Sequence, residues 1–448
     1  MPQVRRTSHT MLVSLILLAF VLGACSSSST AGTPTVPATP DTAPTPTTVR
    51  TPIPTLVSDV EPETHITIWL SWDRAELSAL QERIDAFQAD APQVGFSIRY
   101  AREEDLLEAF MQAQQDDPHP ALLLGPAEWA LPLREEGLIL DLTELVDAEL
   151  MSTVSMLGWR QVTLNEQIIG LPLELQGMVL YRNTALASEA PRTVSAWIEA
   201  ARSITEGGGV ASVLDLTFET SASHLTACGE TLFHSDGTYG FSGDSGVCWL
   251  ELLQEIGRTG QVSFGSTLAG EAFAAGNAAW WMGSSGELRH LNQVMGSESV
   301  AIDAWPLSDA TGDPMAGFVW SENIYISSAQ ETESLEAAWR FSRFLLTPDS
   351  QRLFSDPGGA AHIPVLEALN LTDSQMASAS AAVQSGVPYP TRTDLDVFIR
   401  PLEEAVFDTL VQGRAPIDAI EAAEDSIEFG LSILSVGGEL PQEEPEEP

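Results

Sequence analysis

The chain has 448 residues and carries 63 acidic side chains against 20 basic ones, which gives a formal net charge of −43. Every basic residue is arginine, so Schiff-base and P-loop lysine chemistry is excluded. So large an excess of negative charge argues against binding to nucleic acid or to an anionic membrane surface. The length favours about two or three domains, or two lobes with extra segments.

The N-terminus has the layout of a cleaved export signal. Two arginines precede an apolar run at residues 11–22, which is too short to span a bilayer comfortably. The following "LGAC" at 22–25 resembles the lipobox of bacterial lipoproteins. It implies a signal peptide at 1–24 and acylation of Cys25, and the alternative is a chance cysteine after an ordinary signal.

Low-complexity segments bound the folded part of the chain. Residues 25–62 are mostly Ser, Thr, Pro and Ala and bury too little apolar surface to fold, so we expect an extended tether. Residues 439–448 form an acidic tail. The folded body is therefore expected at about 64–438.

Strands and helices alternate in the first half of the body. "ITIWLSWDR" at 66–74 is a strand that ends on Trp72, Asp73 and Arg74, and Asp73 with Glu76 forms a capping box for the next helix. The remaining expected elements are a helix at 73–92, a strand at 94–100, a helix at 103–115, a strand at 121–125 and a helix at about 129–136.

This alternation predicts an α/β fold with a mostly parallel sheet that is covered by helices on both faces. In such sheets ligands gather at the carboxyl ends of the strands. The residues at two of these ends are 72–74 and 125–129, so both segments are candidates for a binding site.

The second half continues the pattern. A hairpin turn is expected at Asn165–Glu166, followed by an extended segment through Pro172. Trp280 and Trp281 are neighbours in a strand and must point to opposite faces. The other expected elements are helices at 191–204 and 246–260, a helix–strand–helix unit at 271–291, strands at 300–307 and 317–327, and a helix at 334–346.

Several phrases, in this order, resemble the extracellular solute-binding proteins of ABC importers, in the carbohydrate-binding branch that includes maltose-binding protein. They are "ITIWLSWDR", "ALLLGPAEWALPLREEGLILDLTEL", "IIGLPLELQGMVLYRNTAL", "AFAAGNAAWWMGSS" and "AAWRFSRFLLTPDSQRLFSDPGGAAHIPV". The resemblance implies a two-lobed periplasmic-binding-protein fold that closes on its ligand at a hinge. The implied parts are lobe I at 64–175 plus 303–358 and lobe II at 176–302 plus 359–438.

The resemblance also implies which residues contact a sugar, since sugars bind to aromatic faces and to carboxylate, amide and guanidinium groups. Asp73 fits a charged ligand contact, and its helix-capping role is an alternative or an addition. Gly286 stands where the family has a stacking tryptophan, which puts the ligand's identity in doubt. The full set of expected ligand contacts is Trp72, Asp73, Arg74, Glu128, Trp129, Glu174, Gln176, Trp281, Glu287, Trp320, Asn323, Tyr389 and Phe398.

Cys228 and Cys248 are the only cysteines besides Cys25, and a disulfide is the default for an exported chain. A zinc site with His224 and His234 is the alternative, although the chain lacks a C-x-x-C pair.

The sequence contains weak indications of two classes of enzyme. "GDSGV" around Ser245, with His224, weakly resembles a serine protease, but the two residues are too close in sequence for that fold. Paired carboxylates for glycoside hydrolysis are available in so acidic a chain, but no pair stands out.

The sequence therefore predicts a lipid-anchored receptor on the outer face of the cytoplasmic membrane. It captures a carbohydrate and delivers it to the transmembrane subunits of an ABC permease, as a monomer, without catalysis and without a metal or cofactor. The alternatives are a receptor of the same fold for a polyamine or another small solute, in which carboxylates and tryptophans surround a cation, and an extracellular hydrolase.

Overall fold

The computed structural model describes residues 62–435 except 114–118, 216, 235–236 and 264–265. The expected signal peptide, Cys25, the tether up to residue 61 and the acidic tail lie outside the described residues. Among the helices that are described, none has the length and apolar character needed to cross a membrane.

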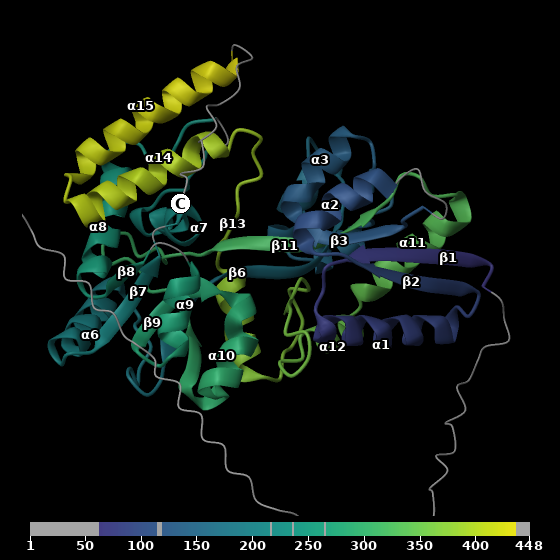
Figure 1. The fold of residues 1–448 in the computed structure, drawn as a ribbon, viewed down its shortest axis with the longest axis horizontal. Coiled ribbons are helices and arrows are strands. Elements are labelled where there is room, and N and C mark those ends of the chain that lie inside the picture. Colours follow the sequence, from purple (N-terminus) through teal and green to yellow (C-terminus); the bar gives the residue numbers. More distant parts are fainter. Residues whose placement is uncertain (1–61, 114–118, 216, 235–236, 264–265, 436–448) are drawn as a thin grey trace, which may run out of the picture. The chain divides into compact units, whose positions relative to one another are not determined.

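Strands from both halves of the chain form one sheet in the order β2-β1-β3-β11-β6-β9-β7-β8 (Figure 1). The main strands are β1 (Thr64–Leu70), β2 (Val94–Tyr100), β3 (Leu122–Pro126), β6 (Leu171–Asn183), β7 (Val210–Asp215), β8 (Gln261–Ser263), β9 (Ala278–Ser284) and β11 (Phe318–Ile326). The short strands are β4 (Thr163–Leu164), β5 (Gln167–Ile168), β10 (Val300–Asp303), β12 (Ile363–Pro364) and β13 (Val387–Pro388).

Helices pack around the strands at both ends of the sheet (Figure 1). Around β1–β3 lie α1 (Arg74–Asp90), α2 (Glu103–Gln112), α3 (Ala130–Glu135), α11 (Thr332–Leu345) and α12 (Pro348–Phe354), all within the segments expected for lobe I. Around β7–β9 lie α6 (Val194–Glu206), α7 (Phe218–Ser221), α8 (Asp244–Arg258), α9 (Ser266–Ala274), α10 (Leu288–Met295), α14 (Asp396–Phe407) and α15 (Pro416–Ser435), within the segments expected for lobe II.

Helices α5 (Met156–Val162) and α13 (Ser374–Gln384) pack against the connecting strand β6, whereas α4 (Ala148–Thr153) lies beside α11, where its N-cap Asp147 binds Arg343. α13 belongs to the sequence expected for lobe II, and its Met376 and Ala379 join an apolar cluster that contains residues expected for both lobes, such as Leu173 and Trp281. The lobe boundaries given above remain a prediction.

The long strand β6 passes from one lobe to the other. Its residues 171–177 pair with β11, and its residues 178–182 pair with β9. Both pairings are antiparallel, whereas the strand pairs β1–β2, β1–β3, β7–β8 and β7–β9 are parallel. The prediction of a mostly parallel sheet is thus wrong for the central strands, because the strands that connect the lobes are antiparallel to their neighbours.

Local sequence signals account for several elements. Asp73 caps α1 through the backbone N–H groups of Ala75 and Glu76, and Glu76 accepts from the Asp73 N–H, which completes the predicted capping box. Asn165 and Glu166 have φ values of 49° and 67°, as a two-residue hairpin of the type I′ class requires.

Strand alternation separates the neighbouring tryptophans of β9, as predicted. Trp280 packs into a core cluster with Trp197 and Leu250, while Trp281 packs into a second cluster with Phe273 and Tyr181. Both rings are almost fully buried, so the two faces of β9 are both covered.

The expected disulfide joins Cys228, at the end of a 3-10 helix, to Cys248 on α8. His224 is buried, and its Nδ1 lies 2.8 Å from the carbonyl oxygen of Ala316. Burial lowers the pKa of His224 to about 4, so its ring is neutral. The zinc alternative is wrong for this structure, because the disulfide occupies both sulfur atoms.

Candidate ligand-binding cleft

Four side chains lie on one face of β6 and β11, where the lobes meet. Glu174 pairs with Glu322, and Gln176 pairs with Trp320, across the antiparallel ladder. Residues that are opposite on such a ladder, or two apart on one strand, share a face. Glu174 is buried, Gln176 is exposed and Trp320 is half-buried. This hinge face therefore runs from a buried acidic end to an open polar and aromatic end.

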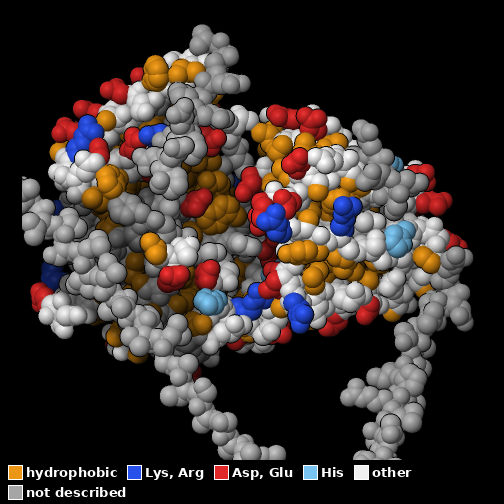
Figure 2. All heavy atoms as spheres, in the orientation of Figure 1, with side chains coloured by type: hydrophobic (Ala, Val, Ile, Leu, Met, Phe, Trp, Pro, Cys, Tyr) orange, Lys and Arg blue, Asp and Glu red, His pale blue; other side chains and the backbone are white. Residues whose placement is uncertain are grey.

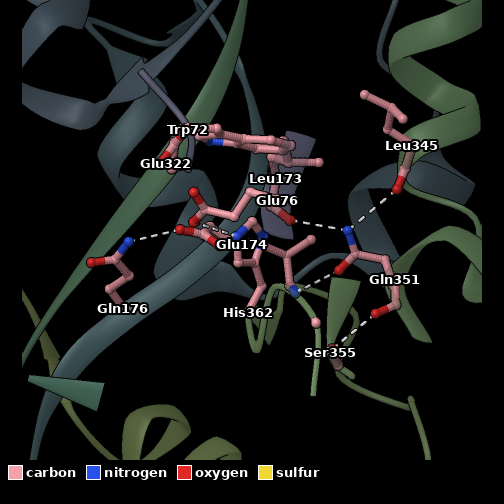
Figure 3. A network of polar contacts seen from close by, with 12 residues as sticks. Trp72, Glu76, Leu173, Glu174, Gln176, Glu322, Leu345, Gln351, Ser355 and His362 are labelled. Atoms are coloured by element: carbon pink, nitrogen blue, oxygen red, sulfur yellow. Dashed lines mark hydrogen bonds and ion pairs between the residues drawn. The ribbon is translucent and has the colours of Figure 1, made fainter. Parts of the chain in front are cut away.

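His362 neutralises the buried end of the hinge face (Figure 3). Its Nδ1 lies 2.5 Å from Glu174 Oε2, and its Nε2 lies 3.1 Å from Glu76 Oε1. Burial alone would lower the pKa of His362, but the carboxylates of Glu174 and Glu76 raise it to about 10. His362 is therefore an imidazolium ion held between two carboxylates. Glu174 also accepts a hydrogen bond of 2.7 Å from Gln176 Nε2 and so orients that amide.

Glu322 is the third carboxyl of this cluster, and it is uncharged near neutral pH. Burial raises its pKa, and the charge of Glu174 adds to the increase, to about 8. Trp72 Nε1 donates a hydrogen bond to Glu322 Oε1. A protonated carboxyl retains an O–H donor, so Glu322 combines donor and acceptor capacity beside the exposed Gln176.

Aromatic rings line the open end of the hinge face. Trp320 and Tyr389 are stacked with ring centroids 5.4 Å apart and an interplanar angle of 28°. The ring of Phe318 supports Tyr389 from a centroid distance of 5.2 Å. Burial raises the pKa of Tyr389, and repulsion by nearby carboxylates adds to the increase, so its hydroxyl stays protonated. The stack offers a flat surface for the apolar side of a ligand.

Carboxylates flank this stack from both lobes. Glu128 follows the end of β3, and Glu219 lies on α7 at the end of β7. Both side chains are exposed, yet partial desolvation raises the pKa of each carboxyl above its ordinary value. Acidic side chains are also visible along the border of the two lobes in Figure 2. The site is therefore acidic on both sides of the aromatic surface.

An ion pair connects the lobes at the end of β1. Arg289 of α10 binds the Asp73 carboxylate with its Nη2, and its Nη1 donates a 3.0 Å hydrogen bond to the Gly359 carbonyl oxygen. Burial alone would raise the pKa of Asp73, but the backbone donors of Glu76 and Ala75 together with Arg289 lower it. Asp73 thus serves as helix cap and interlobe partner, while Arg74 is exposed at the start of α1.

Some predicted contacts are buried away from any ligand. Asn323 is fully buried, and its amide binds Ser321 and the Tyr325 hydroxyl. A bulge in β11 between Glu322 and Asn323 interrupts the register at this point. Phe398 is also fully buried, in a cluster with Phe233, Tyr239 and Phe241. Direct ligand contact by Asn323 or Phe398 is inconsistent with this burial.

Tryptophans at the strand ends also support the site from behind. Trp129 is 8% exposed and folds back on Gly125, where a Cβ atom would lie only 2.3 Å from its ring. Trp72 is 3% exposed and meets Phe354 and His362 edge to face. Little of either ring is open to a ligand in this structure, so direct contact by Trp72 and Trp129 stays a prediction, and Trp72 positions Glu322 through its Nε1 donor.

Trp281 and Glu287 line a cavity whose lining includes no residue of the hinge face. Trp281 is buried and stacked on Tyr181 at 5.4 Å, and its edge lines a cavity of about 440 Å³ between α9 and α10. Glu287 and Ser284 line the same cavity. Of the predicted residues, the structure brings Glu128, Gln176, Trp320 and Tyr389 to the site, with Glu174 directly behind Gln176.

Sequence reasoning missed three residues of the site. Glu219 follows the end of β7, and the strand-end rule that selected Glu128 would also have found it. His362 and Arg289 carry no comparable local signal, because their partners Glu76 and Asp73 are 286 and 216 residues away in the chain.

Several solved structures with the same fold contain maltose-type sugars or a related compound. Maltose-bound MalE3 of T. maritima is 18% identical, with a TM-score of 0.64, and the match covers 82% of this chain and 99% of that one. A cyclo/maltodextrin-binding protein complexed with maltotetraose is 16% identical, with a TM-score of 0.72, and the match covers 84% of this chain and 98% of that one. The GacH receptor of Streptomyces glaucescens GLA.O, solved unliganded and with acarbose, is 15% identical, with a TM-score of 0.66. That match covers 83% of this chain and 99% of the receptor.

Sequence comparison identifies the family. No curated protein is significantly similar in sequence. The family model described as bacterial extracellular solute-binding protein matches residues 82–384. Members of this family are receptors without catalytic activity, so the protease and glycosidase alternatives are set aside. Because this family model matches more than half of the chain and the fold is the two-lobed periplasmic-binding-protein fold, the chain belongs to the bacterial extracellular solute-binding proteins, the receptors of ABC importers.

Proposed function

We propose that this protein is a lipid-anchored receptor that captures a carbohydrate between lobes I and II for import. The observation that carries the proposal is the hinge face, where the Trp320–Tyr389 stack lies beside the exposed amide of Gln176. Sugars present apolar C–H surfaces that stack on aromatic rings, and hydroxyls that donate and accept hydrogen bonds. The stack and the amide match these two properties.

The buried cluster behind the face supports the same ligand class. The Gln176 amide is held by Glu174, which in turn is held by His362. A binding group whose rotamer is fixed in advance loses less entropy when the ligand binds. Several structural neighbours carry maltose, maltotetraose or acarbose, which agrees with a saccharide ligand here. The absence of a tryptophan at Gly286 favours a saccharide that differs from theirs.

The lipid anchor and the importer are the remaining parts of the proposal. "LGAC" at 22–25 supports acylation of Cys25, and the Ser/Thr/Pro-rich segment after it would hold the receptor body away from the membrane. The transmembrane subunits of an ABC importer are the expected partners. A Cys25→Ser variant tests the anchor, because it should move from the membrane fraction to the aqueous phase, and retention in the membrane would contradict it.

Melting curves against a panel of mono- and oligosaccharides test the ligand class. A ligand at a hundred times its dissociation constant adds about 2.7 kcal/mol to the free energy of unfolding, which is an easily measured shift of the melting temperature. A selective increase with one saccharide series is the expected result. No shift with any saccharide would contradict the proposed function.

A further inference from the structure

A cavity of about 500 Å³ lies where β13 pairs with β11 (Figure 1). Its walls come from both lobes, because α5 is in the segment expected for lobe I, whereas the 3-10 helix η3 (Ala222–Cys228) and residues 387–392 are in segments expected for lobe II. None of the four strand residues that define the hinge face lines this cavity, although Tyr389 borders both. The cavity is therefore a second place where a ligand can contact both lobes.

One buried hydroxyl of the cavity wall lacks a hydrogen-bond partner among the described residues. Ser223 on η3 is only 3% exposed, and its Oγ forms no hydrogen bond there. The hydroxyl of Thr226, which also lines the cavity, donates to the backbone carbonyl oxygens of Ser223 and Pro314. Because a buried hydroxyl without a hydrogen bond is unfavourable, Ser223 is suited to contact a polar group of a ligand.

Two guanidinium groups line the same cavity. Arg160 of α5 is exposed and forms no ion pair with a carboxylate of the described residues. Arg392 binds Asp394 through Nε and Nη2, each at 2.7 Å, and its Nη1 is not used in this pair. The acidic residue of the lining, Glu230, already binds His234 Nε2 at 2.8 Å. The wall therefore offers a ligand mainly hydrogen-bond donors.

The charge of the lining differs from that of the chain as a whole. Two arginines and one acidic residue line the cavity, whereas the chain has 20 basic and 63 acidic side chains. Guanidinium groups bind carboxylate and phosphate oxygens through charge-assisted hydrogen bonds, often in pairs. The donors of this wall thus match a ligand that carries an oxyanion.

Aromatic rings form an apolar part of the wall. The ring of Phe233 lies beneath the Arg392 guanidinium, whose carbon is 4.4 Å from the ring centroid. Phe318 is buried and meets Tyr389 edge to face at 5.2 Å. Apolar walls with a few convergent polar groups are typical of small-molecule sites. The oxyanion is therefore expected on a ligand with an apolar body.

We propose that this cavity binds a small organic anion, whose carboxylate or phosphate oxygens accept hydrogen bonds from Arg160 and Ser223. The apolar body of the anion packs against Phe233 and Phe318. The site is separate from saccharide capture at the hinge face and does not depend on it. Since α5 and η3 both line the cavity, the bound anion contacts the two lobes together.

Titration calorimetry of the full-length protein at low ionic strength tests the site, because salt screens the attraction between exposed charges. The anionic probes are benzoate and phenyl phosphate, and benzyl alcohol is the neutral probe with the same ring. The variants are Arg160→Gln, which removes the charge, and Ser223→Ala, which removes the hydroxyl. Arg192→Gln is the charge control, because Arg192 is exposed and lies outside the lining.

At least one anionic probe should bind the wild type about tenfold or more tightly than benzyl alcohol, as a hydrogen bond to a charged group provides. Arg160→Gln should remove about tenfold of that affinity and Ser223→Ala about threefold, whereas Arg192→Gln should remove none. Without a probe, Ser223→Ala should melt at the temperature of the wild type or higher, because the hydroxyl that it loses has no partner. The tighter of the two anions identifies the oxyanion as carboxylate or phosphate.

The inference fails if benzyl alcohol binds as tightly as both anions, or if neither anion binds. An anion affinity that is unchanged in Arg160→Gln and in Ser223→Ala would also overturn it, and loss of that affinity in Trp320→Ala would then place the anion at the hinge face. No saccharide enters this experiment, so each of these outcomes leaves the proposed function to be tested by the melting curves with saccharides.

Discussion

The Asp73 carboxylate and the Arg289 guanidinium form an ion pair between the start of α1 in lobe I and α10 in lobe II. Arg289 also donates to the Gly359 carbonyl oxygen at 3.0 Å. Both charged groups are partly exposed, so the pair contributes little to overall stability, less than about 1 kcal/mol. Because the ion pair joins the two lobes, we nevertheless expect it to restrain how far they separate.

An Arg289→Ala variant should therefore open the ligand-free protein without unfolding it. The radius of gyration in small-angle scattering should increase, because one interlobe link is lost. Arg352→Ala is the matched control, since its ion pair with Asp349 lies within the single helix α12. A radius of gyration equal to that of the wild type would show that the ion pair does not restrain the lobes.

The cluster around Glu322 makes stability depend on pH. The folded-state pKa of Glu322 is raised from the ordinary value of 4.5 to about 8, so between these values the folded protein keeps a proton that the unfolded chain releases. Stability from this group is fully present below pH 4.5 and is lost as the pH rises through 8. His362 acts in the same direction at higher pH, between 6.5 and about 10.

Glu322→Gln keeps an acceptor for Trp72 Nε1 and removes the titration. As the pH increases from 5 to 8, the free energy of unfolding of the variant should rise relative to that of the wild type, because the amide stays neutral. Urea unfolding at several pH values measures this difference. The decline caused by His362 should persist in the variant. Parallel pH profiles for the wild type and Glu322→Gln would contradict the assignment, and Glu428→Gln provides the charge control.

The disulfide between Cys228 and Cys248 closes a loop with a sequence separation of 20. In the chain-entropy model such a loop stabilises the folded state by about 3 kcal/mol. Replacing both cysteines by serine should lower the free energy of unfolding by about that amount, measured by denaturation with guanidinium. A double variant as stable as the oxidised wild type, with oxidation verified by mass, would rule out this contribution.

Local patterns in the sequence were enough to predict the elements that depend on neighbouring residues. The Asp73 cap, the Asn165–Glu166 turn and the placement of Trp280 and Trp281 on opposite faces of β9 all follow from spacing within a few residues. The direction of β6 did not follow, because an antiparallel crossing between lobes depends on partners that are distant in the chain.

The site was predictable only in part for the same reason. Gln176 and Trp320 could be chosen as strand residues near the crossing, but their pairing with each other is a matter of long-range register. Phe398 shares the buried face of α14 with Leu402 and Ala405, a helical spacing that indicates core. The link from His362 to Glu76 has no local signature, because it joins the second segment expected for lobe II to α1, 286 residues earlier in the chain.

Saccharide binding at the hinge face is tested most directly by the affinity of the Trp320→Ala variant for the saccharide that raises the melting temperature. The wild type should show saturable binding by titration calorimetry, and the variant should lose about tenfold or more in affinity, because a central aromatic contact is removed. Tyr389→Phe keeps the stack and should retain most of the affinity. Unchanged affinity in a folded Trp320→Ala protein would contradict binding at the hinge face.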